Sequence, residues 1–135
     1  MTESEALEKI SQYPKPAGLL LLSIRQLIFE VADSDGVGQV EESLKWGELS
    51  YSVKGGSPVR IAWSEKKPDS VSVYFVCTTS LVETFREIYA ELFIFHGNRE
   101  IEIPMDKPVQ FEPLAHCFSL AFHYKSLRHL PLLGT

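Results

Sequence analysis

The chain has little cysteine and no long aliphatic run. Cys77 and Cys117 are its only cysteines in 135 residues, which is far fewer than disulfide-stabilised secreted domains carry, so we expect two buried thiols. The longest aliphatic run, Leu19 to Leu22, is much shorter than the ~20 residues that cross a bilayer. The first residues are acidic and polar, unlike a secretory signal. We therefore expect a cytoplasmic chain without a membrane partner.

Clustered basic residues are also scarce. The chain has 13 Lys and Arg against 18 Asp and Glu, for a formal net charge of -5. Lys66 and Lys67 are the only adjacent basic pair, whereas a nucleic-acid site needs clustered cations. We therefore expect no nucleic-acid partner. The length and the 44% hydrophobic content are ordinary for one globular domain, so residues 1–135 are interpreted as a single domain.

Alternating apolar residues predict an antiparallel sheet in the middle of the chain. Period two is typical of strands with one buried face, and we expect strands at about 39–45, 49–53, 59–65, 70–77, 92–96 and 100–104. Gly47 predicts a bulge or sharp bend beside Trp46. The positions expected to face the core are Leu49, Tyr51, Val53, Val59, Ile61, Trp63, Val71, Val73 and Phe75.

Three-to-four-residue periodicity predicts helices before, within and after the strands. The main N-terminal helix should run from about Ala17 to Ala32, after a short frayed helix. A capping box at Ser80 and Glu83 predicts a middle helix, and Pro113 suits the first turn of a final helix. We expect residues 128–134 to pack back on the sheet. The fold class is therefore α+β, with about five to six strands and helices that cover one face.

No motif for catalysis, a metal or a cofactor stands out. Asp33, Asp35 and Gly36 resemble the start of a calcium loop, but its twelfth position is Leu44 instead of the required bidentate Glu. No nucleophile elbow or papain-like cysteine segment occurs. The glycine pairs do not precede a helix, as a phosphate-binding loop requires. We therefore predict no catalytic residue, no resident metal and no cofactor.

Aromatic and basic residues nevertheless suggest a ligand-binding surface. Arg60 and Tyr74 have the strand parity opposite to the core, and guanidinium groups beside aromatic rings can hold carboxylates, phosphates or acidic peptide segments. The alternative is that Trp46 belongs to the core and that the arginines form ion pairs with Glu83, Glu87 or Glu102. The candidate ligand-binding residues are Trp46, Tyr51, Arg60, Tyr74, Arg86, Asn98 and Arg99.

Five segments carry a resemblance to a known family: Glu42–Tyr51 with its Lys-Trp-Gly signature, Ser57–Trp63, Tyr74–Arg86, Phe95–Ile101 and His129–Gly134. Through them the chain resembles, between residues 13 and 134, the YdhG-like family, a bacterial domain of largely unassigned function. The resemblance implies a frataxin-like α+β fold. At least one relative is described as an iron chaperone, which implies an acidic iron-binding surface; the available acidic residues are Glu30, Asp33, Asp35, Glu41 and Glu42.

Three functional hypotheses follow from the sequence. The leading hypothesis is a cytoplasmic, non-enzymatic binding domain that recognises a small anionic ligand or an acidic protein segment. The first alternative is a frataxin-like intracellular iron chaperone, and the second is a small-molecule enzyme with an unrecognised site. We expect a monomer or a weak homodimer whose partner is a small molecule or a protein.

Overall fold

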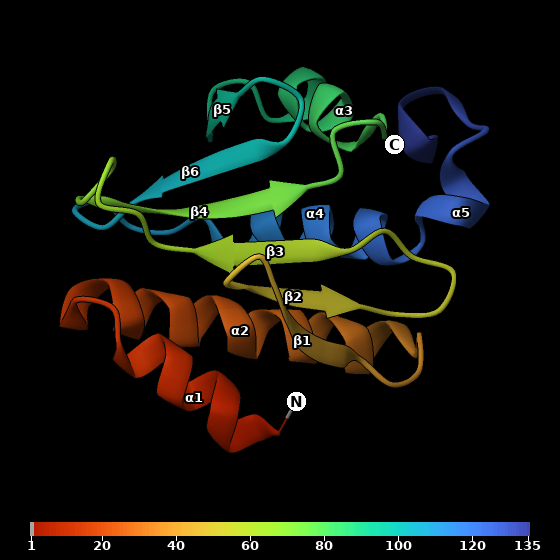
Figure 1. Cartoon of the computed structure of the whole chain (residues 1–135). Helices are drawn as coiled ribbons and strands as arrows, with labels where there is room; N and C mark the ends of the chain where they lie inside the picture. Colours follow the sequence, from red (N-terminus) through yellow and green to blue (C-terminus); the bar gives the residue numbers. More distant parts are fainter. Residues whose placement is uncertain (1) are drawn as a thin grey trace.

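The computed structural model describes residues 2–135 and contains a six-stranded antiparallel sheet in the order β1-β2-β3-β4-β6-β5 (Figure 1). The predicted α+β class is confirmed. The strands are β1 (Glu41–Lys45), β2 (Glu48–Ser52), β3 (Val59–Ala62), β4 (Ser70–Phe75), β5 (Ile94–His96) and β6 (Glu100–Pro104). The helices are α1 (Glu3–Ser11), α2 (Lys15–Asp35), α3 (Leu81–Ile88), α4 (Phe111–Phe122), α5 (Tyr124–Leu127) and the 3-10 helix η1 (Pro131–Gly134).

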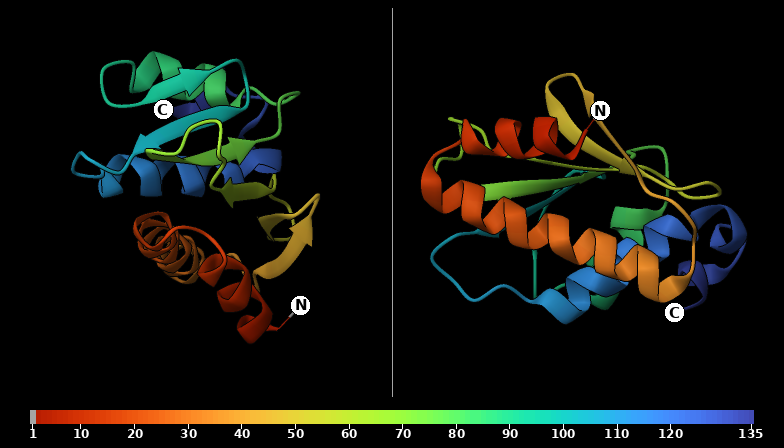
Figure 2. Two further views of the ribbon diagram at one scale, coloured as in Figure 1. Left: turned by 60° about the vertical axis from the view of Figure 1, so that its left-hand side comes forward. Right: turned by 90° about the horizontal axis from the view of Figure 1, so that it is seen from below.

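The core lies between one face of the sheet and the helices α2 and α4, which run side by side along that face (Figure 2). Leu49, Ile61, Val73 and Ile101 form a row across β2, β3, β4 and β6, and all four are fully buried. Each such side chain contributes roughly 1.5–3 kcal/mol through removal from water. The predicted odd-numbered core positions are therefore confirmed within these strands, whereas Trp63 lies beyond the end of β3 and is only partly buried.

Helix α2 is longer at both ends than its apolar period predicts. Pro16 lies in its first turn, where the missing N–H of proline costs nothing. The helix ends at Gly36, whose φ of 64° allows its N–H to donate to the carbonyls of Ala32 and Asp33. Since Gly36 is the first residue that suits this left-handed cap, Asp33 and Asp35 are helical, and the predicted end of the helix at Ala32 is three residues too early.

Helix α1 is docked on the rest of the fold, not frayed. Ala6 and Ile10 are buried in the main core, and α1 contacts both α2 and β1. Thr2 caps the helix, because its side chain accepts from the N–H of Glu5. No helix within residues 2–135 combines the length and the apolar character that a membrane crossing requires.

A two-residue turn joins β1 to β2. Lys45 pairs with Glu48, and Trp46 and Gly47 have φ values of 54° and 79°, which identifies a hairpin turn of type I′. The predicted sharp bend is confirmed. The Trp46 side chain is 93% exposed, so the interpretation of Trp46 as a core residue is wrong.

The start of α3 differs from the predicted capping box. The Ser80 side chain makes no capping hydrogen bond. The backbone N–H of Leu81 donates to the Thr79 hydroxyl at 3.4 Å, and the N–H of Ser80 donates to the Tyr124 hydroxyl at 3.2 Å. The Tyr124 hydroxyl of α5 therefore accepts from the Ser80 N–H, which the predicted capping box paired with the Glu83 side chain.

The C-terminal segment packs on helices and not on the sheet. The η1 turn contacts α3 and α5, and Leu133 is its one buried residue. Leu130 and Leu132 stay largely exposed. The prediction that residues 128–134 return to the sheet is therefore wrong, because α4 already covers that face.

Candidate functional site

The face of the sheet that points away from α2 and α4 carries polar side chains at its centre. The register places Ser50, Arg60, Tyr74 and Glu100 side by side across β2, β3, β4 and β6. Their parity is opposite to that of the core row, so they alternate with it along each strand. The predicted outward direction of Arg60 and Tyr74 is confirmed by their partial exposure.

A hollow of about 300 Å³ lies at the end of this face where β3 begins and β4 ends. Arg60 and Tyr74 are register partners within it, and the Arg99 guanidinium carbon lies 4.6 Å from the centre of the Tyr74 ring. The structure thus brings three of the predicted binding residues together. We call this the arginine hollow; its lining is completed by Pro58, Phe75, Val76 and Cys77.

The arginine hollow is positively charged and only weakly neutralised. No carboxylate lines it. Arg60 reaches Glu48 at 3.8 Å, with both side chains partly exposed, and such a pair is worth at most about 1 kcal/mol. Within residues 2–135, Arg99 has no carboxylate within 4 Å. Stacking on Tyr74 orients the Arg99 guanidinium and leaves its in-plane N–H donors available to an anion.

Tyr51 does not belong to this site, which corrects the prediction. It is fully buried in the core, and its hydroxyl donates to Glu42 at 2.7 Å. Arg25 donates to the same carboxylate at 2.6 and 3.0 Å. Burial raises the pKa of Tyr51 strongly, and the hydrogen bond to Glu42 raises it further. The three side chains hold the β1–β2 hairpin on α2, and removal of one partner from such a buried pair is costly.

Trp46 lies at the opposite end of the sheet from the arginine hollow. The turn that contains Trp46 leads into the start of β2. Because β2 and β3 are antiparallel, the start of β2 lies beside the end of β3, where Leu49 pairs with Ile61. The hollow is at the start of β3, beside Pro58. The structure therefore does not combine Trp46 with the arginines, although it confirms that the indole is accessible.

Arg86 and Asn98 support the β5–β6 turn next to Arg99. Arg86 donates to the carbonyl of Gly97 at 2.6 Å, and its guanidinium carbon lies 5.3 Å from the centre of the Phe95 ring. Asn98 lies in the same turn and is exposed. Neither residue lines the arginine hollow. Arg86 instead fixes the turn that carries Arg99.

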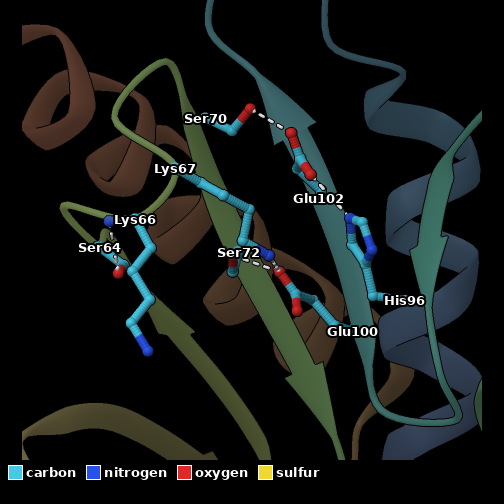
Figure 3. A network of polar contacts seen from close by, with 8 residues as sticks. All are labelled: Ser64, Lys66, Lys67, Ser70, Ser72, His96, Glu100 and Glu102. Carbon is cyan, nitrogen blue, oxygen red and sulfur yellow. Dashed lines mark hydrogen bonds and ion pairs between the residues drawn. The ribbon is translucent and has the colours of Figure 1, made fainter.

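A polar network on β4, β5 and β6 has no counterpart in the sequence predictions (Figure 3). Glu102 accepts from the hydroxyl of Ser70 at 2.7 Å and contacts His96 at 2.7 Å. Glu100 accepts from Ser72 at 2.7 Å and pairs with Lys67 of the β3–β4 turn. The alternation of serines on β4 and of glutamates on β6 is the sequence signal from which this network could have been predicted.

This network lowers the pKa of Glu102, chiefly through the hydrogen bond from Ser70 and then through that from His96. Its contacts hold β6 to both of its neighbours, so the network is structural. The predicted alternative, in which arginines pair with Glu83, Glu87 or Glu102, is wrong for residues 2–135, because none of these ion pairs forms there.

Asp35, Ser119 and His123 meet where α2 and α4 end, in a composition that invites comparison with a catalytic triad. The Ser119 hydroxyl donates to Asp35 at 2.6 Å. His123 Nδ1 lies 2.9 Å from the backbone carbonyl of Ser119 and 3.6 Å from Asp35. A triad requires the hydroxyl to bond to the imidazole. Here the hydroxyl bonds to the carboxylate, so the imidazole does not activate it.

The acidic residues considered for iron do not gather into one site. Glu42 is occupied by Arg25 and Tyr51, Asp35 by Ser119, and Glu30 accepts from Gln26 at 3.1 Å. Across the part of the chain that the structure describes, no three His, Cys, Asp or Glu side chains are grouped closely enough to hold a metal ion. The remaining two candidates are Asp33, which is exposed on α2, and Glu41 of β1, which lies opposite Ser52 of β2 in the strand register.

The two cysteines have different environments. Cys117 is fully buried, and burial raises the pKa of its thiol strongly, which keeps it protonated and unreactive. Cys77 is exposed and lines the arginine hollow. The expectation that both thiols are buried is therefore wrong for Cys77, because β4 ends at Phe75 and the chain leaves the sheet there. Tyr51 and Cys117 are the groups with the largest pKa changes, and neither lines the arginine hollow.

Comparison of the chain with protein-family models, with curated proteins and with solved structures finds no match. Function is therefore inferred from the residues that the fold brings together. Among the predicted residues, the arginine hollow is the arrangement in which charge, accessibility and orientation coincide.

Proposed function

We propose that the chain is a non-enzymatic binding domain that recognises an anionic group in the arginine hollow. The observation that carries this proposal is the placement of two arginines around Tyr74, with Arg60 beside it on the next strand and Arg99 over its ring, in a hollow that no carboxylate lines. The anionic group belongs to a small molecule or to an acidic segment of a protein.

The chemistry of the three side chains supports this role. A guanidinium group presents a planar fork of donors that matches a carboxylate or a phosphate. Arg99 is stacked on Tyr74, and an ordered arginine loses less side-chain entropy on binding than a mobile one. The weak pair between Arg60 and Glu48 is one that an incoming anion can displace, since exposed pairs are worth little.

We also infer that the domain has a frataxin-like arrangement of the kind that its resemblance to the YdhG-like family implies. Helices α2 and α4 on one face of an antiparallel sheet support this inference. The Lys-Trp-Gly signature forms the β1–β2 turn, which gives that sequence a structural reason: Gly47 takes the second left-handed position of the turn.

A titration followed by NMR tests the proposal. Citrate and inorganic phosphate are added separately to the wild type, to Arg60→Gln/Arg99→Gln and to Lys66→Gln/Lys107→Gln. The control pair removes the same charge from residues outside the arginine hollow. We expect at least one anion to shift the Nε–Hε signals of Arg60 and Arg99, with affinity at least about tenfold weaker in the arginine variant.

The control variant should retain the wild-type affinity. Equal losses in both double variants would mean that the anion responds only to overall charge. An absence of shifts at Arg60 and Arg99 with both anions would also contradict the proposal.

A further inference from the structure

A second hollow continues the arginine hollow beyond the end of the sheet. Its volume is about 420 Å³, and it shares Pro58 and Val76 with the arginine hollow. Lys125 of α5 and Arg128, which follows α5, line its far side. Figure 1 shows α5 beyond the end at which β3 begins and β4 ends. The two hollows therefore adjoin at Pro58 and Val76, and we call them together the groove.

The groove has a charge opposite to that of the whole chain. Its charged lining residues are Arg60, Arg99, Lys125 and Arg128, and no Asp or Glu lines either hollow, whereas the chain has a net charge of -5. Within residues 2–135, Arg99, Lys125 and Arg128 take part in no ion pair. A ligand therefore meets several unneutralised cations along the groove.

Uncharged residues separate the two groups of cations, and we call these residues the saddle. Pro58 and Val76 are shared by both hollows, and Val76 is 36% exposed. Thr78, which is also exposed, adds a hydroxyl beside them. A small anion can engage one group of cations at a time. A ligand that uses the whole groove needs acidic groups separated by short uncharged stretches.

Helix α5 is held in place before any ligand arrives. The N–H of Lys125 donates to the carbonyl of Gly55 at 3.2 Å, and the Tyr124 hydroxyl accepts from the N–H of Ser80. Gly56 packs so tightly that a Cβ there would lie 2.9 Å from the Phe122 carbonyl. The β2–β3 turn and α3 thus fix Lys125 and Arg128 relative to the sheet, which lowers the entropic cost of binding.

We propose that the groove binds an extended acidic segment of a partner protein, with carboxylates on Arg60 and Arg99 at one end and on Lys125 and Arg128 at the other. This inference rests on the proposed function and extends it from a single anion to a peptide. Alternating acidic and small apolar residues in an extended segment match the order of cations and saddle along the groove.

The same features disfavour a nucleic acid. A nucleic acid carries a charge at every nucleotide, and the uncharged residues between the two groups of cations offer no partner to the phosphates that would lie there. Single-stranded nucleic acids also need aromatic faces on which bases stack. One face of Tyr74 is already covered by Arg99.

The test measures binding of a short synthetic peptide in which glutamate alternates with alanine and valine. The full chain is compared with Lys125→Gln/Arg128→Gln and with the control Lys66→Gln/Lys107→Gln, and citrate binding at Arg60 and Arg99 is measured for each. We expect the Lys125→Gln/Arg128→Gln variant to bind the peptide about tenfold more weakly than the wild type and to bind citrate unchanged. A peptide with glutamine in place of glutamate should not bind.

Other outcomes overturn this inference in distinguishable ways. If the peptide binds Lys125→Gln/Arg128→Gln as tightly as the wild type, the extended groove is wrong while anion binding in the arginine hollow stands. If citrate and the peptide both leave the signals of Arg60 and Arg99 unchanged, the proposed function and the extended groove are both wrong. Tighter binding of single-stranded oligodeoxythymidylate, or self-association that the variant abolishes, would assign the groove to a nucleic acid or to a second copy of this chain.

Discussion

Four arginines of this chain have different surroundings, and those surroundings decide the role of each side chain. Arg25 is nearly buried and makes two hydrogen bonds to Glu42. Arg86 donates to a backbone carbonyl and fixes a turn. Arg60 has one distant carboxylate. Arg99 lies over the ring of Tyr74 and, within residues 2–135, has no carboxylate within 4 Å. The more weakly an exposed guanidinium is satisfied within the protein, the more of its hydrogen-bonding capacity remains for a ligand.

Trp46 gives a test at a single residue. Its φ of 54° is unfavourable for a residue with a Cβ, and type I′ turns favour asparagine followed by glycine. We expect Trp46→Asn to raise the free energy of unfolding by about 0.5–1 kcal/mol. Urea denaturation of the two proteins measures the difference. A buried tryptophan would instead lose roughly 3–5 kcal/mol on truncation, so a loss of that size would show that the indole packs against the protein in solution.

At the scale of elements, the two edges of the sheet are stabilised differently. The β1–β2 edge is held by one nearly buried cluster of Arg25, Glu42 and Tyr51 against α2. The β6–β5 edge is held by polar contacts on the exposed face, in which Glu102 joins β4 to β5. The first arrangement excludes water, whereas the second remains accessible to protons. Glu102 gives the second edge a dependence on acid pH, because its pKa is lowered in the folded state.

The lowered pKa of Glu102 predicts a pH dependence for this edge. A carboxyl whose pKa is lower in the folded than in the unfolded state stabilises the fold above its unfolded pKa, which is about 4.3 for glutamate. That contribution is lost as the pH falls through the folded pKa. Ser70 is the largest cause of the lowering. We therefore expect Ser70→Ala to lower the melting temperature at pH 7 and to raise the pKa of Glu102.

Thermal melts at pH 7 and at pH 3, with an NMR titration of the Glu102 carboxyl, check this expectation. The difference between Ser70→Ala and the wild type should shrink as the pH falls through the folded pKa of Glu102, because protonation removes the carboxylate that Ser70 stabilises. Ser52→Ala on the same face is a suitable control, because Ser52 has no part in the network. A difference that stays constant between the two pH values would mean that Ser70 acts through packing and not through Glu102.

For the whole molecule, periodicity predicted more of the architecture than of the site. The alternation in β2, β3 and β4 gives the core face, and the same alternation sends Arg60 and Tyr74 outward. It also assigned Tyr51 to the core, in conflict with its candidate role, and the core assignment is correct. Local sequence therefore contained enough information to place these three residues.

Other parts of the site depend on contacts between distant segments. Arg99 reaches Tyr74 because β6 inserts next to β4, which the order of elements along the chain does not reveal. Lys125 and Arg128 join the groove because α5 is bound to the β2–β3 turn and to the start of α3. The sequence left Trp46 open as a binding residue or as a core residue, because a glycine indicates a bend without showing which side of it remains in water.

The most direct test of the central claim is a double-mutant cycle for citrate binding with Arg60→Gln, Arg99→Gln and the double variant. If both guanidinium groups hold the same anion, their losses should be coupled by at least about 0.5 kcal/mol, as for groups that share one partner. Calorimetry of the four proteins measures this coupling. Losses that simply add would show that the two arginines act independently, which would contradict a single anion site over Tyr74.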